Sequence, residues 1–323
     1  IFGIFGLQPG DDVQALRRQS LELSQKQRHR GPDWSGVYHD DGAILVHERL
    51  AIVDPAGGSQ PLRSADGELV LAVNGEIYNH RELKAELTQD YAFQTGSDCE
   101  VINALYREDE PASFLNRLNG IFAFALWDRD SGRAIIARDP IGVVPLYWGH
   151  DAQGRLRVAS ELKALVDSCA DAAQFPPGHY YTPRTGFVKY YRPQWEDASK
   201  AIEAVDYEAI RATLTQAVEK RLMSDVPIGV LLSGGLGVEA EVVVGRPVGL
   251  GLLAAVEGLA GRVLLEVHDQ AGAHAEHGVR FDVGAVGHEQ VGGQLHVAGG
   301  VDHHVDVAGP VGVAAHAIQH AAH

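Results

Sequence analysis

The chain has 323 residues, of which 45% are hydrophobic, and a formal charge of −16. This length favours two domains with sizeable cores, and the negative charge argues against nucleic acid or an anionic membrane surface as a partner. No apolar run approaches the ~18 residues of a membrane span, and we expect no signal peptide. With Cys99 and Cys169 as the only cysteines, we expect no disulfide framework and a cytoplasmic location.

The first part of the chain alternates short helical and extended segments. Residues 14–27 have leucines on one helical face and predict an amphipathic helix. Residues 42–54 and 68–79 predict strands that run into turns at Asp54-Pro55 and Asn74-Gly75. These three elements already mix helix and strand within the first 80 residues.

The following segments continue this mixed pattern. Asp98 is suited to be the N-cap of a helix over residues 98–108. Residues 120–139 predict a hairpin that turns at Asp130-Ser131-Gly132, and residues 156–165 predict a strand followed by a short helix. The segment up to about residue 193 therefore predicts an α+β fold.

A second unit begins near Val205. Residues 206–224 predict an amphipathic helix whose apolar residues lie four apart, at Ile210, Leu214, Val218 and Leu222. Residues 228–232 predict a buried strand that opens onto Ser233-Gly234-Gly235. A strand ending in such a loop can present backbone N–H groups to phosphates, although the same three residues also suit an ordinary turn.

The composition changes abruptly after Leu236. The 87 residues from Gly237 to His323 contain no Ser, Thr, Asn, Lys, Tyr, Trp, Cys or Met, and they hold 10 of the 16 histidines. These eight types make up roughly a third of ordinary protein usage. We interpret this tail as the product of a frameshift or rearrangement and expect it to be poorly ordered. A histidine-rich metal-binding extension is the alternative, but the histidines show no repeated ligand spacing.

Six motifs occur in order along the first 236 residues: RHRGPD at 28–33, RLAIVD at 49–54, NGEIYN at 74–79, GSDCE at 96–100, RDPIG at 138–142 and MSDVPIGVLLSGGL at 223–236. Together they resemble the glutamine-hydrolysing asparagine synthetases, a family with a class II (N-terminal-nucleophile) glutaminase domain. The first four motifs are shared with related glutamine amidotransferases. The last motif points to the synthetase branch.

The resemblance implies a fold and a division into domains. Residues 1–204 are expected to form a glutaminase domain with four layers, αββα, in which two mainly antiparallel sheets lie between helices. Residues 205–236 are expected to be the first helix and strand of a truncated α/β ATP-pyrophosphatase domain, the asparagine synthetase domain. Residues 237–323 are expected to be an anomalous tail that does not belong to the family.

The resemblance also implies a glutamine site. Amide hydrolysis needs a nucleophile, a base and an oxyanion hole, and in this family the nucleophile is a terminal Cys whose own amine is the base. Asn74 and Gly75 match the oxyanion-hole positions. Arg49 suits the carboxylate of free glutamine, and Asp98 suits its ammonium group. The expected glutamine-binding residues are Arg49, Leu50, Ala51, Ile52, Val53, Asn74, Gly75, Glu76 and Asp98.

Simpler interpretations of these residues remain open. Arg49 could be an ordinary ion-pair partner at the surface. Asn74-Gly75 could be only a turn, and Asp98 could be only a helix N-cap. Cys99 suits a small buried residue better than a nucleophile.

The sequence departs from the family at the nucleophile. The family begins Met-Cys-Gly-Ile-Phe-Gly, whereas this chain begins Ile-Phe-Gly-Ile-Phe-Gly, so that Phe2 stands where the family has its Cys. A phenyl ring has no lone pair for attack and forms no thiolate. We therefore expect the chain as written not to hydrolyse glutamine.

A second departure falls in the nucleotide loop. The family continues Ser-Gly-Gly-Leu-Asp-Ser-Ser, but here Leu236 is followed by Gly237-Val238-Glu239. The residues that can be assigned to ATP are Leu232, Ser233, Gly234 and Gly235. The family uses ATP and Mg²⁺, and we expect this truncated chain to bind neither. No residue cluster predicts a metal site.

Two classes of function remain. The first is the ligase of asparagine biosynthesis, which adenylates aspartate and amidates it with ammonia released from glutamine. The second is a non-catalytic, glutaminase-like remnant that at most binds glutamine. The expected partners are small molecules, namely glutamine, with aspartate and ATP in the intact family; a homodimer is left open.

Overall fold

Residues 1–197, 199, 205–226, 241–244, 250–257, 262–269, 278–282 and 296–297 are described by the computed structural model. The chain divides into two units, Ile1–Val205 and Asp206–His323, and each is considered by itself. The predicted strand at 228–232 and the loop Ser233-Gly234-Gly235 lie outside the described residues.

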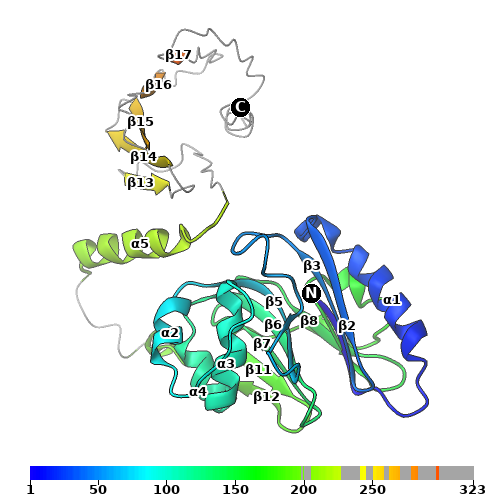
Figure 1. Ribbon diagram of the computed structural model, residues 1–323. Coiled ribbons are helices and arrows are strands. Elements are labelled where there is room, and N and C mark those ends of the chain that lie inside the picture. Colours follow the sequence, from blue (N-terminus) through cyan, green and yellow to red (C-terminus); the bar gives the residue numbers. More distant parts are fainter. Residues whose placement is uncertain are drawn as a thin grey trace. The chain divides into compact units, whose positions relative to one another are not determined.

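The alternating segments of the first unit form two six-stranded sheets (Figure 1). Sheet A has the strand order β10-β8-β9-β1-β3-β2, and sheet B has the order β12-β11-β7-β6-β5-β4. The strands of sheet A are β1 (Phe2–Phe5), β2 (Trp34–His39), β3 (Ala43–Arg49), β8 (Tyr147–His150), β9 (Leu156–Ala159) and β10 (Ala173–Gln174). The strands of sheet B are β4 (Leu62–Arg63), β5 (Leu69–Ile77), β6 (Gly120–Asp128), β7 (Arg133–Arg138), β11 (His179–Thr182) and β12 (Gly186–Lys189). The pairings within both sheets are antiparallel.

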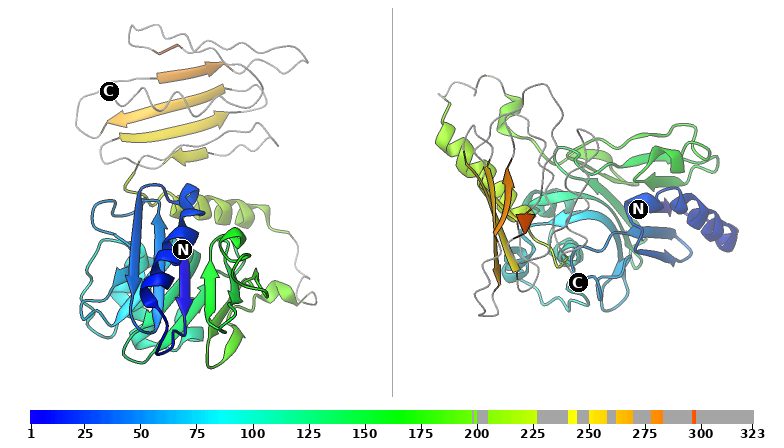
Figure 2. Two further views of the ribbon diagram at one scale, coloured as in Figure 1. Left: turned by 90° about the vertical axis from the view of Figure 1, so that its right-hand side faces the viewer. Right: turned by 90° about the horizontal axis from the view of Figure 1, so that it is seen from above.

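Helices cover the outer face of each sheet, which gives the four layers αββα. Helix α1 (Val13–Gln25) lies across sheet A, where it contacts β1 and β3 (Figure 2, left). Sheet B is covered by α2 (His80–Glu86), α3 (Val101–Glu108) and α4 (Pro111–Arg117). The described residues of the unit also include the 3-10 helices η1 (Arg28–Arg30), η2 (Asp98–Glu100), η3 (Leu162–Ala164) and η4 (Gln194–Glu196). The predicted α+β fold with two antiparallel sheets is confirmed.

Apolar side chains fill three layers of core between these elements. Strand β1 shows how the alternation works, because successive side chains of a strand point to opposite faces of its sheet. Phe5 packs with Leu45 and Val158 between the two sheets, whereas Phe2 and Ile4 pack on the other face of sheet A, in the cluster that includes Leu23 of α1. The ring of Phe2 is fully buried.

Two local predictions were wrong, and both concern the site. Asn74-Gly75 is not a turn but lies inside β5, opposite Ala123 and Phe122 of β6. Gly75 has a φ of 141° and a Cβ there would collide with the carbonyl oxygen of Ile121, so glycine is needed for close pairing rather than for a turn.

The second error concerns the start of the helix at residues 98–108. Ser97 is the N-cap, and its Oγ accepts a hydrogen bond from the Cys99 N–H at 3.3 Å. Asp98 belongs to η2, and its Oδ2 accepts instead from the N–H of Ile77 in β5, at 2.6 Å. The carboxylate of Asp98 is thus turned toward sheet B and away from its own helix.

The second unit begins with helix α5 (Tyr207–Arg221), which Asp206 caps by accepting a hydrogen bond from the Ala209 N–H at 3.0 Å. Its predicted apolar stripe is present, but Ile210, Leu214 and Val218 are exposed. The described residues of the tail form an antiparallel sheet of β13 (Glu241–Val244), β14 (Leu250–Glu257), β15 (Arg262–Asp269), β16 (Gly278–Asp282) and β17 (His296–Val297).

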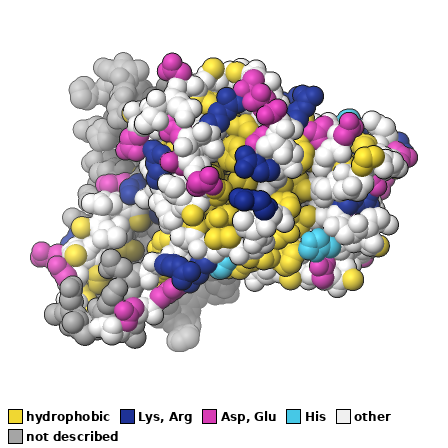
Figure 3. Space-filling model, turned by 90° about the horizontal axis from the view of Figure 1, so that it is seen from below, with side chains coloured by type: hydrophobic (Ala, Val, Ile, Leu, Met, Phe, Trp, Pro, Cys, Tyr) yellow, Lys and Arg dark blue, Asp and Glu magenta, His cyan; other side chains and the backbone are white. Residues whose placement is uncertain are grey.

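The described surface carries charges of both signs. On the face drawn in Figure 3, acidic and basic side chains are interspersed around apolar side chains, and neither sign gathers into a single large patch. None of the helices in the part of the chain that the structure describes has the length and apolar character needed to cross a bilayer.

Candidate functional site

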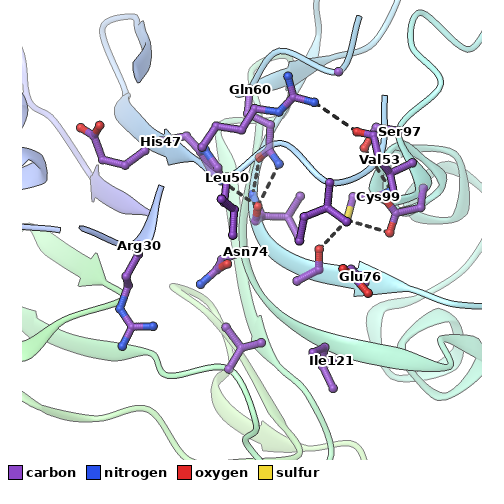
Figure 4. Close-up of a pocket in the computed structure, with 18 residues that line it drawn as sticks. Arg30, His47, Leu50, Val53, Gln60, Asn74, Glu76, Ser97, Cys99 and Ile121 are labelled. Atoms are coloured by element: carbon purple, nitrogen blue, oxygen red, sulfur yellow. Dashed lines mark hydrogen bonds between the residues drawn. The ribbon is translucent and has the colours of Figure 1, made fainter. Parts of the chain in front are cut away.

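A cavity of about 200 Å³ lies among the ends of several elements of the first unit (Figure 4). Its walls come from β3, the loop at residues 50–60, β5 and η2. The cavity gathers eight of the nine residues expected to bind glutamine: Arg49, Leu50, Ile52, Val53, Asn74, Gly75, Glu76 and Asp98. A volume of this size suits a free amino acid better than a drug-sized ligand, which needs roughly 300–1,000 Å³.

Arg49 ends β3 and holds the loop that follows it. Its Nη2 donates to the carbonyl oxygens of Val53 and Asp54, at 3.1 and 2.6 Å, and its Nη1 donates to that of Pro55 at 3.2 Å. A guanidinium has five N–H donors, so Arg49 keeps two for a ligand. The interpretation of Arg49 as a surface ion-pair partner is wrong, because the side chain is buried and donates to backbone carbonyls.

Asp98 provides a buried carboxylate that also lines the cavity. Besides the Ile77 N–H, its Oδ2 receives a weak hydrogen bond from the Cys99 thiol at 3.5 Å. Burial, and then the adjacent Asp98 charge, raise the pKa of Cys99 well above its ordinary value. Cys99 therefore stays a thiol at neutral pH, and the cavity presents Asp98 as its anionic group on this side.

Asn74 and Gly75 are consecutive residues of β5 that line the same cavity. Within the described part of the chain, the side-chain amide of Asn74 has no hydrogen-bond partner, and it is half-buried at the cavity (Figure 4). An amide left unpaired at a cavity can donate to an incoming oxygen. Glu76 follows in the same strand and adds a second carboxylate to the lining.

Ala51 is the expected residue that the cavity does not include. Its N–H donates to Oδ2 of Asp33 at 2.9 Å, so this backbone group fastens the loop to the segment before β2. The neighbouring Leu50 lines the cavity and is 55% exposed, which places it at the mouth.

The comparisons with known proteins agree with this geometry. Residues 1–204 match the family described as a glutamine amidotransferase domain, and residues 209–237 match the family described as asparagine synthase. The chain belongs to the glutamine amidotransferase domain family. The resemblance to glutamine-hydrolysing asparagine synthetases that the motifs indicated is thereby confirmed.

The relatives of this amidotransferase domain include asparagine synthetase B of Escherichia coli, which is 52% identical over 238 residues, 73% of this chain and 42% of that protein. A probable asparagine synthetase of Schizosaccharomyces pombe is 51% identical over 230 residues, 70% of this chain and 41% of that protein. The chain therefore spans less than half the length of these relatives. Among solved structures, glutamine phosphoribosylpyrophosphate amidotransferase from B. subtilis has a TM-score of 0.47 at 26% identity, covering 59% of this chain and 49% of that one.

Two residues of the amidotransferase pocket escaped the sequence reasoning, His47 and Gln60. His47 is buried in β3 and its Nε2 donates to the carbonyl oxygen of Val73 at 2.8 Å; burial lowers its pKa to about 3. Gln60 pairs with both backbone groups of Val73, at 2.9 and 2.8 Å. His47 links β3 to β5, and Gln60 links the loop at residues 50–60 to β5. These hydrogen bonds become visible only in the folded structure. The other lining residues not named as ligands are Arg30, Glu48, Gly58, Val73, Ser97, Cys99, Ile121 and Val144.

Phe2, at the nucleophile position of the amidotransferase family, does not line the cavity. Its side chain lies with Ile4, Ile44 and Val46 in the cluster beneath α1. A phenyl ring has no lone pair, so the side chain of Phe2 cannot itself attack an amide carbon.

The residues assigned to ATP, namely Leu232, Ser233, Gly234 and Gly235, lie outside the described residues. Within the described ranges there is no group of three or more His, Cys, Asp and Glu side chains that could hold a metal ion.

Proposed function

We propose that residues 1–204 form a glutaminase-type domain that binds free L-glutamine in this cavity without hydrolysing it. One observation carries the proposal: a cationic side chain, an anionic side chain and an unpaired amide, contributed by Arg49, Asp98 and Asn74, line the same cavity. A free amino acid brings a carboxylate, an ammonium group and, in glutamine, a terminal amide. Each of these groups has a complementary partner in the wall.

The roles follow from hydrogen-bonding capacity. The donors that Arg49 does not use for the loop are its Nε–H and one Nη1–H, which diverge, so one of them would bind the α-carboxylate in a charge-assisted hydrogen bond. Asp98 would accept from the α-ammonium group, with Glu76 beside it. The Asn74 amide and the Gly75 N–H would bind the side-chain carbonyl oxygen of glutamine, where an oxyanion develops in family members that hydrolyse it. Main-chain groups of Leu50, Ile52 and Val53 would complete the wall.

Hydrolysis requires a nucleophile that this site lacks. Phe2 offers no lone pair, and the raised pKa of Cys99 keeps its sulfur protonated at neutral pH. The alternative is an active member of the family, which would release ammonia from glutamine and pass it to an adenylated aspartate. We favour binding without turnover because the described cavity contains recognition groups and no activated nucleophile.

The remaining assignments complete the proposal. Residues 205–236 would be the start of a truncated asparagine synthetase domain, with Leu232, Ser233, Gly234 and Gly235 as the remnant of its ATP site, and residues 237–323 a tail foreign to the family. ATP and Mg²⁺ serve the intact ligase and would not be bound by this chain. A cytoplasmic location and small-molecule partners, without nucleic acid, fit its acidic composition.

Isothermal titration calorimetry of the full chain with L-glutamine tests the binding half of the proposal, and D-glutamine is the matched control. We expect saturable binding of the L-isomer and at least about tenfold weaker binding of the D-isomer, since a misplaced charged group forfeits about 1.4 kcal/mol or more. An enzyme-coupled ammonia assay tests the other half, with no release above background expected. Ammonia release that is proportional to protein concentration would contradict the absence of turnover.

A further inference from the structure

Asp54 lies in the loop after β3 and has an unusual backbone. It is the one residue other than glycine with a positive φ, 48°, within the described part of the chain. Asp and Asn adopt this left-handed conformation more readily than other residues, because their short side chains bond to nearby backbone groups. Here Oδ1 of Asp54 accepts from the Gly57 N–H at 2.8 Å, which closes a tight turn.

The second carboxylate oxygen reaches a different loop. Oδ2 of Asp54 accepts from the Gly96 N–H at 2.7 Å, across 42 residues of sequence. The backbone of Asp54 is also engaged, because its carbonyl oxygen accepts from Arg49 Nη2 at 2.6 Å and from the Gly58 N–H at 2.9 Å. A single residue thus touches Arg49 on one side and the loop two residues before Asp98 on the other.

Glycines surround this residue for a steric reason. A Cβ on Gly57 would lie 2.6 Å from the Asp54 carboxylate, and one on Gly96 would lie 3.2 Å from it. A Cβ on Gly58 would lie 2.8 Å from Nη2 of Arg49. The three glycines therefore allow two backbone segments to close around one carboxylate and one guanidinium.

The Gly96 loop is fixed from its other side by Glu100. This buried carboxylate accepts from the N–H groups of Gln94 and Thr95, both at 2.8 Å, and from the Thr95 hydroxyl at 2.6 Å. Residues 94–96 are therefore held between Glu100 inside the domain and Asp54 in the loop after β3. Asp98 itself is held by the Ile77 N–H, so the bond from Asp54 to Gly96 acts beside that contact and ties the residues before Asp98 to the loop that holds Arg49.

We propose that Asp54 is a positioning residue that sets the separation between Arg49 and Asp98, and so makes the cavity select ligands carrying both an α-carboxylate and an α-ammonium group. The inference rests on the proposed function, in which these two residues bind those two groups. A carboxylate with two acceptor oxygens can bridge two loops, whereas an amide has a single acceptor oxygen. Replacing Asp54 by Asn would therefore release one of the two backbone amides.

The test compares two ligands of equal length on the wild type and on Asp54→Asn. L-Glutamine carries both charged groups, and glutaramate (5-amino-5-oxopentanoate) lacks the ammonium. The preference for glutamine over glutaramate should fall about tenfold in the variant, the effect of losing one charge-assisted contact, while the Kd of glutaramate changes little. Asp66→Asn is the control, because Asp66 also accepts a backbone N–H, from Glu68 at 3.0 Å, but its other partners are Ser64 and Arg107 rather than Arg49 or the Gly96 loop. A uniform loss for both ligands, or an unchanged preference, would overturn the positioning role.

A ligand-free readout separates this inference from the proposed function. Hydrogen exchange should accelerate at least about tenfold in Asp54→Asn at whichever of the Gly57 and Gly96 amides loses its acceptor, and should be unchanged at both amides in Asp66→Asn. The wild type could bind no glutamine while the exchange changes as expected. In that case the proposed function would be wrong, the hydrogen bonds of Asp54 would have a structural role only, and the selectivity role would be overturned. If Asp54→Asn does not fold, Gly96→Ala serves instead, because its methyl group crowds the Asp54 carboxylate from the other loop. The same fall in preference is expected there, and an unchanged preference again overturns the proposal.

Discussion

The cavity wall and strand β1 belong to the same domain but differ in the chemistry of their side chains. The wall carries charged and amide groups at Arg49, Asn74 and Asp98, which we propose bind a free amino acid. Strand β1 places the ring of Phe2 at the nucleophile position, among Ile4 and Ile44 and out of the cavity. The difference teaches that the groups proposed for recognition and the position proposed for the nucleophile belong to separate elements of this fold, so a change in one need not alter the other.

The largest expected effect comes from disturbing β1 alone. Phe2→Ala should lower the free energy of unfolding by about 3–5 kcal/mol, because a large buried ring leaves a cavity in a packed core. The glutamine Kd of the folded variant should stay within about twofold of the wild type, since Phe2 does not line the pocket. Urea unfolding and calorimetry give the two values. If the Kd rose together with the loss of stability, β1 and the cavity would be energetically coupled, and the contrast between them would be wrong. Phe2→Leu, which keeps most of the side-chain volume, is the control.

A change at Gly75 should damage both regions together. Gly75→Ala forces a methyl group onto the carbonyl oxygen of Ile121 at a φ of 141°, so β5 and β6 must separate locally. We expect a loss of about 3 kcal/mol in urea unfolding and no measurable glutamine binding. Gly67→Ala is the control, because its φ of 74° imposes strain of about 1–2 kcal/mol without any neighbouring atom to strike. Equal losses in the two variants would show that the contact with Ile121 is not decisive.

A change at Asp98 should affect recognition with little effect on stability. Asp98→Asn keeps an oxygen to accept from the Ile77 N–H but removes the charge that would meet the ammonium group. We expect the glutamine Kd to rise about 30-fold, or about 2 kcal/mol, as for other hydrogen bonds to charged groups. The exposed Asp90→Asn should change nothing. An unaltered Kd in Asp98→Asn would remove the ammonium role from this residue.

The smallest effect is a pH dependence that arises between the two regions, at His47. Its pKa in the folded protein, about 3, lies below the ordinary 6.5 because the ring is buried, so the unfolded chain binds the extra proton between these values. Stability from this group is complete above about pH 6.5 and falls as the pH drops toward 3, by about 1 kcal/mol per unit near pH 5.5. Urea unfolding at pH 7, 6 and 5 should show a shallower decline for His47→Gln than for the wild type. Parallel declines would mean that other groups set the acid sensitivity.

The sequence predicted the elements and most of the site because both depend on local signals. Alternating apolar residues define β3 and β5, and the ordered motifs place Arg49, Asn74 and Asp98. Reasoning failed where a residue's role is set by a partner distant in the chain. Asn74-Gly75 has the composition of a turn, yet pairing with β6 keeps it in a strand.

The same limit explains the residues that were missed or misread. Asp98 follows a cap position, but the N–H of Ile77 takes its carboxylate away from the helix. The sequence around His47 and Gln60 contains no motif that predicts their hydrogen bonds to Val73. The bridge from Asp54 to Gly96 spans 42 residues and is visible only once the two loops are placed together.

The raised pKa values of the two cysteines make it possible to measure glutamine binding with a fluorophore attached at one chosen site. Cys99 and Cys169, the only cysteines in the sequence, are both buried, and burial is the leading cause of the raised pKa of each thiol. Maleimide dyes react with thiolates, so both native sulfurs should remain unlabelled in the folded protein at neutral pH. Leu50→Cys would then carry the single accessible thiol, at the cavity mouth, where an attached environment-sensitive fluorophore reports occupancy from one defined position.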